Sequence, residues 1–138
     1  MYVNSNNYIR KIDELGRIVI PKEVRSKLKI GENETILISC DDNKINISKY
    51  SYLNNYHKFI NELSNLLLEI YQTEIEIYDR EKLIYTNHQK DLLNKYSAEI
   101  IKDSTNIGKL ILYSNNNINL DKLTKFVSRL ISIFLATS

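Results

Sequence analysis

The sequence has very few residues that interrupt or cross-link a chain: its 138 residues include one proline, one cysteine, three glycines and no tryptophan. A single cysteine excludes an intrachain disulfide framework and fits a reducing compartment. No run approaches the roughly 18 apolar residues that a membrane span requires, and the first residues lack the apolar core of a signal peptide. We therefore expect a cytoplasmic protein without a membrane partner.

Glycine and histidine are too sparse for the common catalytic and metal sites. Gly16, Gly31 and Gly108 lie far apart, which excludes a glycine-rich phosphate-binding loop. The two histidines, His57 and His88, are not spaced with cysteines or carboxylates as zinc ligands are. We therefore expect no enzymatic activity, no cofactor and no metal site.

The composition is that of a globular protein, with 43% hydrophobic residues, 26% charged residues and ten tyrosines. The net charge is only +2, but its distribution is uneven. Residues 8–30 carry seven of the nineteen basic residues against three acidic ones, whereas residues 51–138 carry ten of each sign. The local excess is either a solvated face or a contact surface for an anionic partner.

Two apolar segments, 8–12 and 17–20, are expected to form a hairpin whose turn contains Gly16. Glycine permits the positive φ of a tight turn, and the short apolar run after it suits a buried strand. Asp13 and Glu14 would repel a phosphate, so we interpret them as residues that fix the turn or pair with Arg17.

A short cationic helix is expected over 21–29. Pro21 suits the first helical position, because its φ is already set and it has no amide proton to lose, and Gly31 is expected to end the segment. Val24 and Leu28 are four residues apart and share the inner face. The outer face carries Lys22, Arg25, Ser26 and Lys29.

Alternation of apolar and polar residues over 35–39 and 44–48, around the turn-forming residues 40–43, predicts a second hairpin. Four short strands and one two-turn helix supply few large apolar side chains, and a core of about fifty residues is marginal on its own. A homodimer that interleaves two such units would share one core and place two cationic helices about a two-fold axis. That symmetry matches the pseudosymmetry of duplex DNA.

The segment "IRKIDELGRIVIPKEVRSKLKIGENETILISCDDNKINISKY" resembles the swapped-hairpin DNA-binding domain of the AbrB and SpoVT transition-state regulators. The resemblance rests on the basic, turn and helix residues from Arg10 to Leu28 and on the paired strands that follow. It implies an intertwined dimer that binds duplex DNA through residues at the positions of Arg10, Lys11, Arg17 and Arg25. With the cationic helix included, the candidate DNA-binding residues are Arg10, Lys11, Arg17, Lys22, Arg25 and Lys27.

Two longer helices are expected at 52–71 and 120–138, because apolar residues recur there at alternating spacings of three and four. Each is short for a freestanding coiled coil, so we expect a bundle with each other or with the same pair of a second subunit. The seam residues that we assign to oligomerisation are Leu53, Tyr56, Ile60, Leu63, Leu67 and Ile70, and then Leu120, Leu123, Val127, Leu130 and Phe134.

Between these helices the pattern predicts four strands and one helix. The strands are expected at 74–79, 82–87, 98–103 and 108–114, and the helix near 88–96. This order resembles a GAF-like sensory domain, of the kind that follows the DNA-binding unit in SpoVT, with the ligand-covering segment missing near Tyr96. We therefore expect a reduced, dimerising GAF-like unit without an enclosed cavity for a drug-sized ligand, roughly 300 Å³. A working sensor is the alternative.

The expected fold class is mixed α/β. An N-terminal swapped-hairpin β-barrel, formed by an intertwined dimer over residues 1–50, precedes a reduced GAF-like α/β domain flanked by packing helices over residues 51–138. The expected function is transcriptional regulation by a homodimer or homotetramer that binds double-stranded DNA. Two alternatives remain open: the antitoxin of a toxin–antitoxin pair, and a small-molecule sensor with DNA binding as its output.

Overall fold

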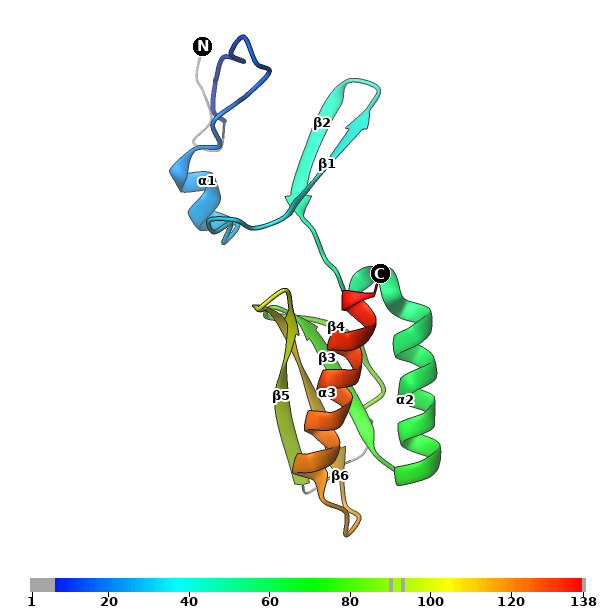
Figure 1. Ribbon diagram of the computed structural model, residues 1–138. Coiled ribbons are helices and arrows are strands. Elements are labelled where there is room, and N and C mark those ends of the chain that lie inside the picture. Colours follow the sequence, from blue (N-terminus) through cyan, green and yellow to red (C-terminus); the bar gives the residue numbers. More distant parts are fainter. Residues whose placement is uncertain (1–6, 90, 93, 138) are drawn as a thin grey trace. The chain divides into compact units, whose positions relative to one another are not determined.

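The computed structural model describes residues 7–89, 91–92 and 94–137 (Figure 1). Contacts within the chain divide it into two units, residues 1–50 and residues 51–138, named here the N-terminal unit and the C-terminal unit. Each unit is described by itself. No helix in the described part of the chain is long and apolar enough to cross a lipid bilayer.

The N-terminal unit contains a short helix, α1 (Lys22–Lys27), and a hairpin of strands β1 (Ile36–Asp41) and β2 (Lys44–Lys49). Asp41 lies opposite Lys44 in the antiparallel pair, so the connection is a turn of two residues, an aspartate and an asparagine. Both residue types favour tight turns. The predicted second hairpin is confirmed, with strand ends that differ by one or two residues.

The first predicted hairpin is wrong for the single chain. The turn forms, and Gly16 takes the predicted positive φ of 76°, but residues 8–12 and 17–20 are not strands. The arms meet at the turn, where the Asp13 N–H donates to the Arg17 carbonyl at 3.0 Å. An isolated two-stranded ribbon is marginal in water unless a face is covered, and the arms of this chain expose their apolar side chains.

Helix α1 is shorter than predicted at both ends. Pro21 is the N-cap and not the first helical residue. Lys29 takes a left-handed φ of 55°, and its amide and the next one donate to the carbonyls of Ser26 and Arg25. These two bonds close the helix by the usual left-handed motif. The prediction that Gly31 ends the helix is therefore wrong, because a lysine takes the left-handed position earlier in the chain.

The C-terminal unit is a four-stranded antiparallel sheet with two helices on one face (Figure 1). A short 3-10 turn, η1 (Asn54–Tyr56), leads into α2 (His57–Tyr71), and α3 (Leu120–Ala136) follows the last strand. The strands lie in the order β4-β3-β6-β5. They are β3 (Glu74–Asp79), β4 (Lys82–Thr86), β5 (Asn94–Lys102) and β6 (Thr105–Ser114).

The helix predicted near residues 88–96 is wrong. The described residues 88, 89, 91 and 92 are not helical, residues 90 and 93 lie outside the described part, and strand β5 already begins at Asn94. Residues 94–96 pair with residues 112–114 of β6, and these ladder bonds override the helical pattern. The last connection is also tighter than expected, since Asp103 and Ser104 form a two-residue turn in which both have positive φ.

The central strands of the sheet carry apolar, fully buried side chains on the face that the helices cover. Ile75 and Ile77 of β3 and Leu110 and Leu112 of β6 have no exposed surface. At the sheet edge, the Tyr85 hydroxyl of β4 donates to Ser64 Oγ of α2 at 2.8 Å. Contacts at both ends show that the two helices run antiparallel. Phe59, near the start of α2, stacks on Phe134, near the end of α3. At the other end, Asn116, just before α3, donates to the carbonyl of Tyr71 at the end of α2.

The seams predicted for oligomerisation pack largely within the chain itself. Leu53, Ile60, Leu67, Leu120 and Val127 are buried. Tyr56, Leu63, Leu123, Leu130 and Phe134 are half-buried, and Ile70 is exposed. Helix-on-sheet packing thus accounts for most of the predicted seam, and a role of these residues between subunits stays a prediction.

Gly108 lies within β6 and not in a turn, opposite Asp79 of β3 and Ile100 of β5. A Cβ atom at this position would lie 2.1 Å from the carbonyl oxygen of Tyr78. The backbone of β3 therefore approaches β6 more closely than any side chain at this position permits.

Replacement of Gly108 by alanine is expected to lower the free energy of unfolding by roughly 1–3 kcal/mol, because the strand must move away from the Tyr78 carbonyl. Urea unfolding followed by circular dichroism measures the change. Gly31→Ala is the control, since an added Cβ there meets nothing within 4 Å. Equal losses in the two variants would contradict the close approach at Gly108.

Candidate nucleic-acid interface

Asp13 organises the turn of the N-terminal unit. Its Oδ1 accepts the backbone N–H groups of Leu15 at 2.9 Å and Arg17 at 2.8 Å, and its Oδ2 accepts Nε of Arg17 at 2.8 Å. The prediction that Asp13 fixes the turn and pairs with Arg17 is confirmed. The Arg17 side chain remains 73% exposed, so the pair orients the guanidinium without burying it.

The same bonds lower the pKa of Asp13 below its ordinary value. The backbone N–H of Arg17 is the largest cause, and the Arg17 side chain is the second. A carboxyl whose pKa falls on folding stabilises the folded state above the unfolded pKa, and this contribution is lost as the pH drops through the folded pKa. At neutral pH the carboxylate is ionised and holds the turn.

The arm before the turn carries Arg10 and Lys11, both exposed. The Arg10 guanidinium donates through Nη1 to the carbonyl of Ile9 at 2.9 Å and lies over the Tyr8 ring, 5.9 Å from its centroid. Sequence reasoning missed Tyr8. The spacing of two between Tyr8 and Arg10 was the available signal, because residues two apart share one side of an extended segment.

The cations of α1 are exposed, and the helix contains no buried residue. Lys22 and Arg25 are three residues apart and share a face. Lys27 follows Arg25 by two residues, about 200° around the helix, so it points away from that face. The structure therefore groups two of the three predicted helix residues and separates the third.

The N-terminal unit has no core of its own, since none of the described residues 7–50 is buried. On the β1–β2 hairpin, Ile38 lies opposite Ile47 and Cys40 opposite Ile45, so one face of the ribbon is apolar and uncovered. Large apolar side chains are exposed in every part of the unit: Ile9, Ile12, Leu15, Ile18, Val19, Leu28, Leu37, Ile38, Ile45 and Ile47.

The C-terminal unit has hollows at its surface, and its sheet–helix interior is filled by apolar side chains. Three open hollows of about 490, 350 and 320 Å³ lie against α3, and strands β3 and β6 line none of these three. Among the described residues, no group of three or more His, Cys, Asp or Glu is placed to hold a metal ion. The expected lack of an enclosed ligand cavity stays a prediction.

The Asp13 carboxyl is expected to titrate below the ordinary aspartate range, and carbon-detected NMR of its side chain measures the midpoint. In Arg17→Gln the pKa should rise only part of the way, because the backbone N–H of residue 17 still donates to Asp13. A complete return to the ordinary aspartate value would show that the side-chain pair, and not the turn backbone, holds the carboxylate.

Comparison with known proteins finds a matching family model and relatives for the N-terminal part of the chain. A family model described as "Antidote-toxin recognition MazE, bacterial antitoxin" matches residues 9–53. Transition state regulatory protein AbrB of Bacillus subtilis (strain 168) is 48% identical over 50 residues, which cover 36% of this chain and 52% of AbrB. Putative transition state regulator Abh of the same organism is 44% identical over 48 residues, which cover 35% of this chain and 52% of Abh.

Stage V sporulation protein T of Bacillus subtilis is 36% identical over 64 residues, which cover 46% of this chain and 36% of that protein. This match is longer than the N-terminal unit and so extends into the C-terminal unit. The solution structure of the N-domain of the transcription factor abrB is 47% identical, covers 36% of this chain and 94% of that chain, and superposes with a TM-score of 0.32. The chain thus spans about half, or less, of the length of the curated relatives that it matches. Residues 9–53 are a MazE/AbrB-type domain, homologous to segments of AbrB and of stage V sporulation protein T.

Proposed function

We propose that this chain is an AbrB-type transcriptional regulator that binds duplex DNA as a homo-oligomer. One observation carries the proposal: the N-terminal unit exposes its cations and nearly all of its apolar side chains together. A unit that lacks a core needs a partner, and an exposed cationic surface favours a polyanion. Homology to proteins named as transition state regulators supports the same function.

A second copy of the N-terminal unit is the partner that best explains the exposed arms. The segments 8–12 and 17–20 are joined by a formed turn, yet they have no ladder within their own chain. In a swapped dimer each arm would pair with strands of the other copy and cover the bare face of the β1–β2 hairpin. The two turns and the two α1 helices would then be related by a two-fold axis, which matches the two-fold pseudosymmetry of duplex DNA.

Arg17 and Arg25 provide the sharpest test of DNA binding. Replacement of either by alanine is expected to weaken binding to specific and random duplexes alike, and to reduce the salt slope by about one for each phosphate that is no longer neutralised. In a dimer one substitution removes two cations. Fluorescence anisotropy at several salt concentrations measures both the affinity and the slope.

Lys58→Ala is the matched control, because it removes one cation from an exposed position of α2 in the C-terminal unit. It should leave the affinity and the salt slope unchanged. If Arg17→Ala and Arg25→Ala fold and bind DNA like the parent, the exposed cations do not contact DNA and are only solvated. An arginine that reads a guanine edge would instead lower only the preference for the cognate site, by roughly 1–3 kcal/mol.

The C-terminal unit, proposed as a reduced GAF-like domain, contributes a second contact between copies. Its two helices carry an apolar stripe that the sheet does not cover: Leu66 and Ile70 on α2, and Phe126 and Ile133 on α3, are 52–63% exposed. Exposed charges on α2 include Glu62 and Glu69, whereas those on α3 include Lys122, Lys125 and Arg129. A two-fold contact that places α2 against α3 of another copy would bury the stripe and match these charges.

The parent chain is expected to sediment as a dimer or tetramer at micromolar concentration, and not as a folded monomer of 16.2 kDa. The double variant Leu66→Glu/Ile70→Glu should form a smaller assembly, because burial of two carboxylates in an apolar contact is costly. Asn65→Glu adds a charge to the same exposed helix outside the stripe and serves as the control. Sedimentation velocity separates these cases, and a parent-sized assembly in the double variant would exclude the α2 stripe as an interface.

The antitoxin alternative draws on the description of the matching family model. An antitoxin of this kind usually ends in a disordered segment that wraps its toxin. The described residues 51–137 instead contain a four-stranded sheet with a buried core. This folded unit favours the regulator over the antitoxin.

A further inference from the structure

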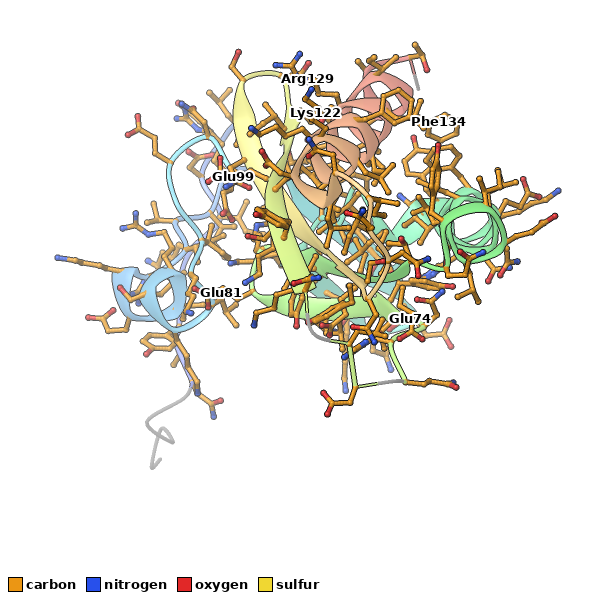
Figure 2. All side chains as sticks on the ribbon, turned by 90° about the horizontal axis from the view of Figure 1, so that it is seen from below. Glu74, Glu81, Glu99, Lys122, Arg129 and Phe134 are labelled. Atoms are coloured by element: carbon orange, nitrogen blue, oxygen red, sulfur yellow. The ribbon has the colours of Figure 1, made fainter. Side chains whose placement is uncertain are left out.

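A polar hollow of about 490 Å³ lies at the end of the C-terminal unit where α3 begins. It is open at the surface, and its volume is within the range of small-molecule sites, roughly 300–1,000 Å³. Figure 2 shows this end of the unit, with Lys122 of the first turn of α3 labelled. The walls are formed by Asn94 and Tyr96 of β5, by residues 116–119 of the connection between β6 and α3, and by Leu120 and Asp121 of α3.

The strand register places the ring of Tyr96 in this hollow. Asn94 lies opposite Ser114 and Tyr96 opposite Leu112, and these two residues of β6 are fully buried. Residues directly opposite in an antiparallel pair share one face, so Asn94 and Tyr96 lie on the side of the sheet that the helices cover. Strand β5 is an edge, however, and Tyr96 remains 48% exposed. Its ring is therefore available to an occupant.

The connection between β6 and α3 is held by its own hydrogen bonds. Asn116 Nδ2 donates to the carbonyl of Tyr71 at 3.0 Å and to Gln72 Oε1 at 2.8 Å. Asn119 Oδ1 accepts the N–H of Lys122 at 3.1 Å and so caps α3. This wall is therefore formed before a ligand arrives, which lowers the entropy cost of binding.

Two serines of α3 fix the helix against β5. Ser128 Oγ donates to the carbonyl of Glu99, and the Ile101 N–H donates to Ser132 Oγ at 3.2 Å. These bonds tie together the two elements that line the hollow, so its walls keep their spacing.

The groups that the hollow offers to a ligand are two neutral amides and one carboxylate. Among the described residues, the side-chain amides of Asn94 and Asn117 have no hydrogen-bond partner. Asp121 Oδ2 accepts Lys125 Nζ at 3.3 Å, which leaves Oδ1 for a ligand. None of the described residues that line the hollow is a cation, so an anion would have no counter-charge there. Amides both donate and accept, as hydroxyl groups do, and the hollow therefore suits a neutral ligand with several hydroxyls.

We propose that this hollow binds a neutral sugar in its pyranose form. One face of the sugar ring carries C–H groups, and these lie on Tyr96, because the face of an aromatic ring is electron-rich and attracts weakly positive C–H groups. The hydroxyls bind the amides of Asn94 and Asn117 and the available oxygen of Asp121. The proposal concerns the C-terminal unit alone and does not depend on DNA binding.

The test is an NMR titration of the full chain with three probes: methyl β-D-glucopyranoside, cyclohexanol and glucose 6-phosphate. The glucoside should shift the amide signals of Tyr96, Asn117 and Asp121 in a saturable manner. Cyclohexanol has a ring of the same size but a single hydroxyl, so it should not. Glucose 6-phosphate should bind no more tightly than the glucoside, because no cation lines the hollow.

Two pairs of variants separate stacking from hydrogen bonding. Tyr96→Ala should weaken the glucoside about three- to tenfold, whereas Tyr96→Phe keeps the ring and should bind like the parent. Asn117→Ala should weaken it by a similar factor, the loss expected for one hydrogen bond. Asn65→Ala is the matched control, because it removes an exposed amide of α2 outside the hollow, and it should change nothing.

Four results would each overturn the proposal: no saturable shift at millimolar glucoside, equal shifts with cyclohexanol, tighter binding of glucose 6-phosphate, or equal weakening in Tyr96→Ala and Tyr96→Phe. Amide dispersion reports folding of every variant. If Tyr96→Ala unfolds, the comparison of Asn117→Ala with Asn65→Ala decides.

Discussion

The packing of β3 and β6 against α2 and α3 is the interaction on which the C-terminal unit depends. It removes Ile75, Ile77, Leu110 and Leu112 from water completely, and apolar burial contributes roughly 25 cal/mol for each Å². The N-terminal unit has no equivalent, since none of its described residues is buried. One half of the chain therefore has a core within a single copy, whereas the described part of the other half has none.

The ion pair between Asp13 and Arg17 orients an exposed cation of the N-terminal unit. In the N-terminal unit, Asp13 holds Arg17 in a defined place at the turn while most of the guanidinium stays in water. The energy of such an exposed pair is small, but its effect on geometry is direct. A cation that is already oriented loses less side-chain entropy when it meets a phosphate, which favours the proposed DNA contact.

Local patterns predicted the features that local forces determine. The β1–β2 hairpin, the turn at Gly16 and the Asp13–Arg17 pair followed from alternation and turn chemistry. The strand at residues 94–96 did not, because its conformation comes from pairing with β6, which is distant in the sequence. The helical seams were identified correctly as apolar, but periodicity alone does not tell whether a helix packs on its own sheet or on another subunit. For the candidate site, the sequence named the cations, and the helical repeat separates Lys27 from Arg25. The contact of Arg10 with the Tyr8 ring was found only in the structure.

The serine bonds between α3 and β5 also limit how the protein can assemble. Strand β5 is an edge of the sheet, and its outward carbonyl at Glu99 and amide at Ile101 are already bound by Ser128 and Ser132. An exposed edge is a template on which strands of neighbouring molecules add without limit, and bound backbone groups no longer offer that template. Along this stretch of the edge, any contact between copies would therefore have to be made by side chains. Side-chain contacts of this kind can close into a finite, symmetric complex, in contrast to the open growth of a fibril.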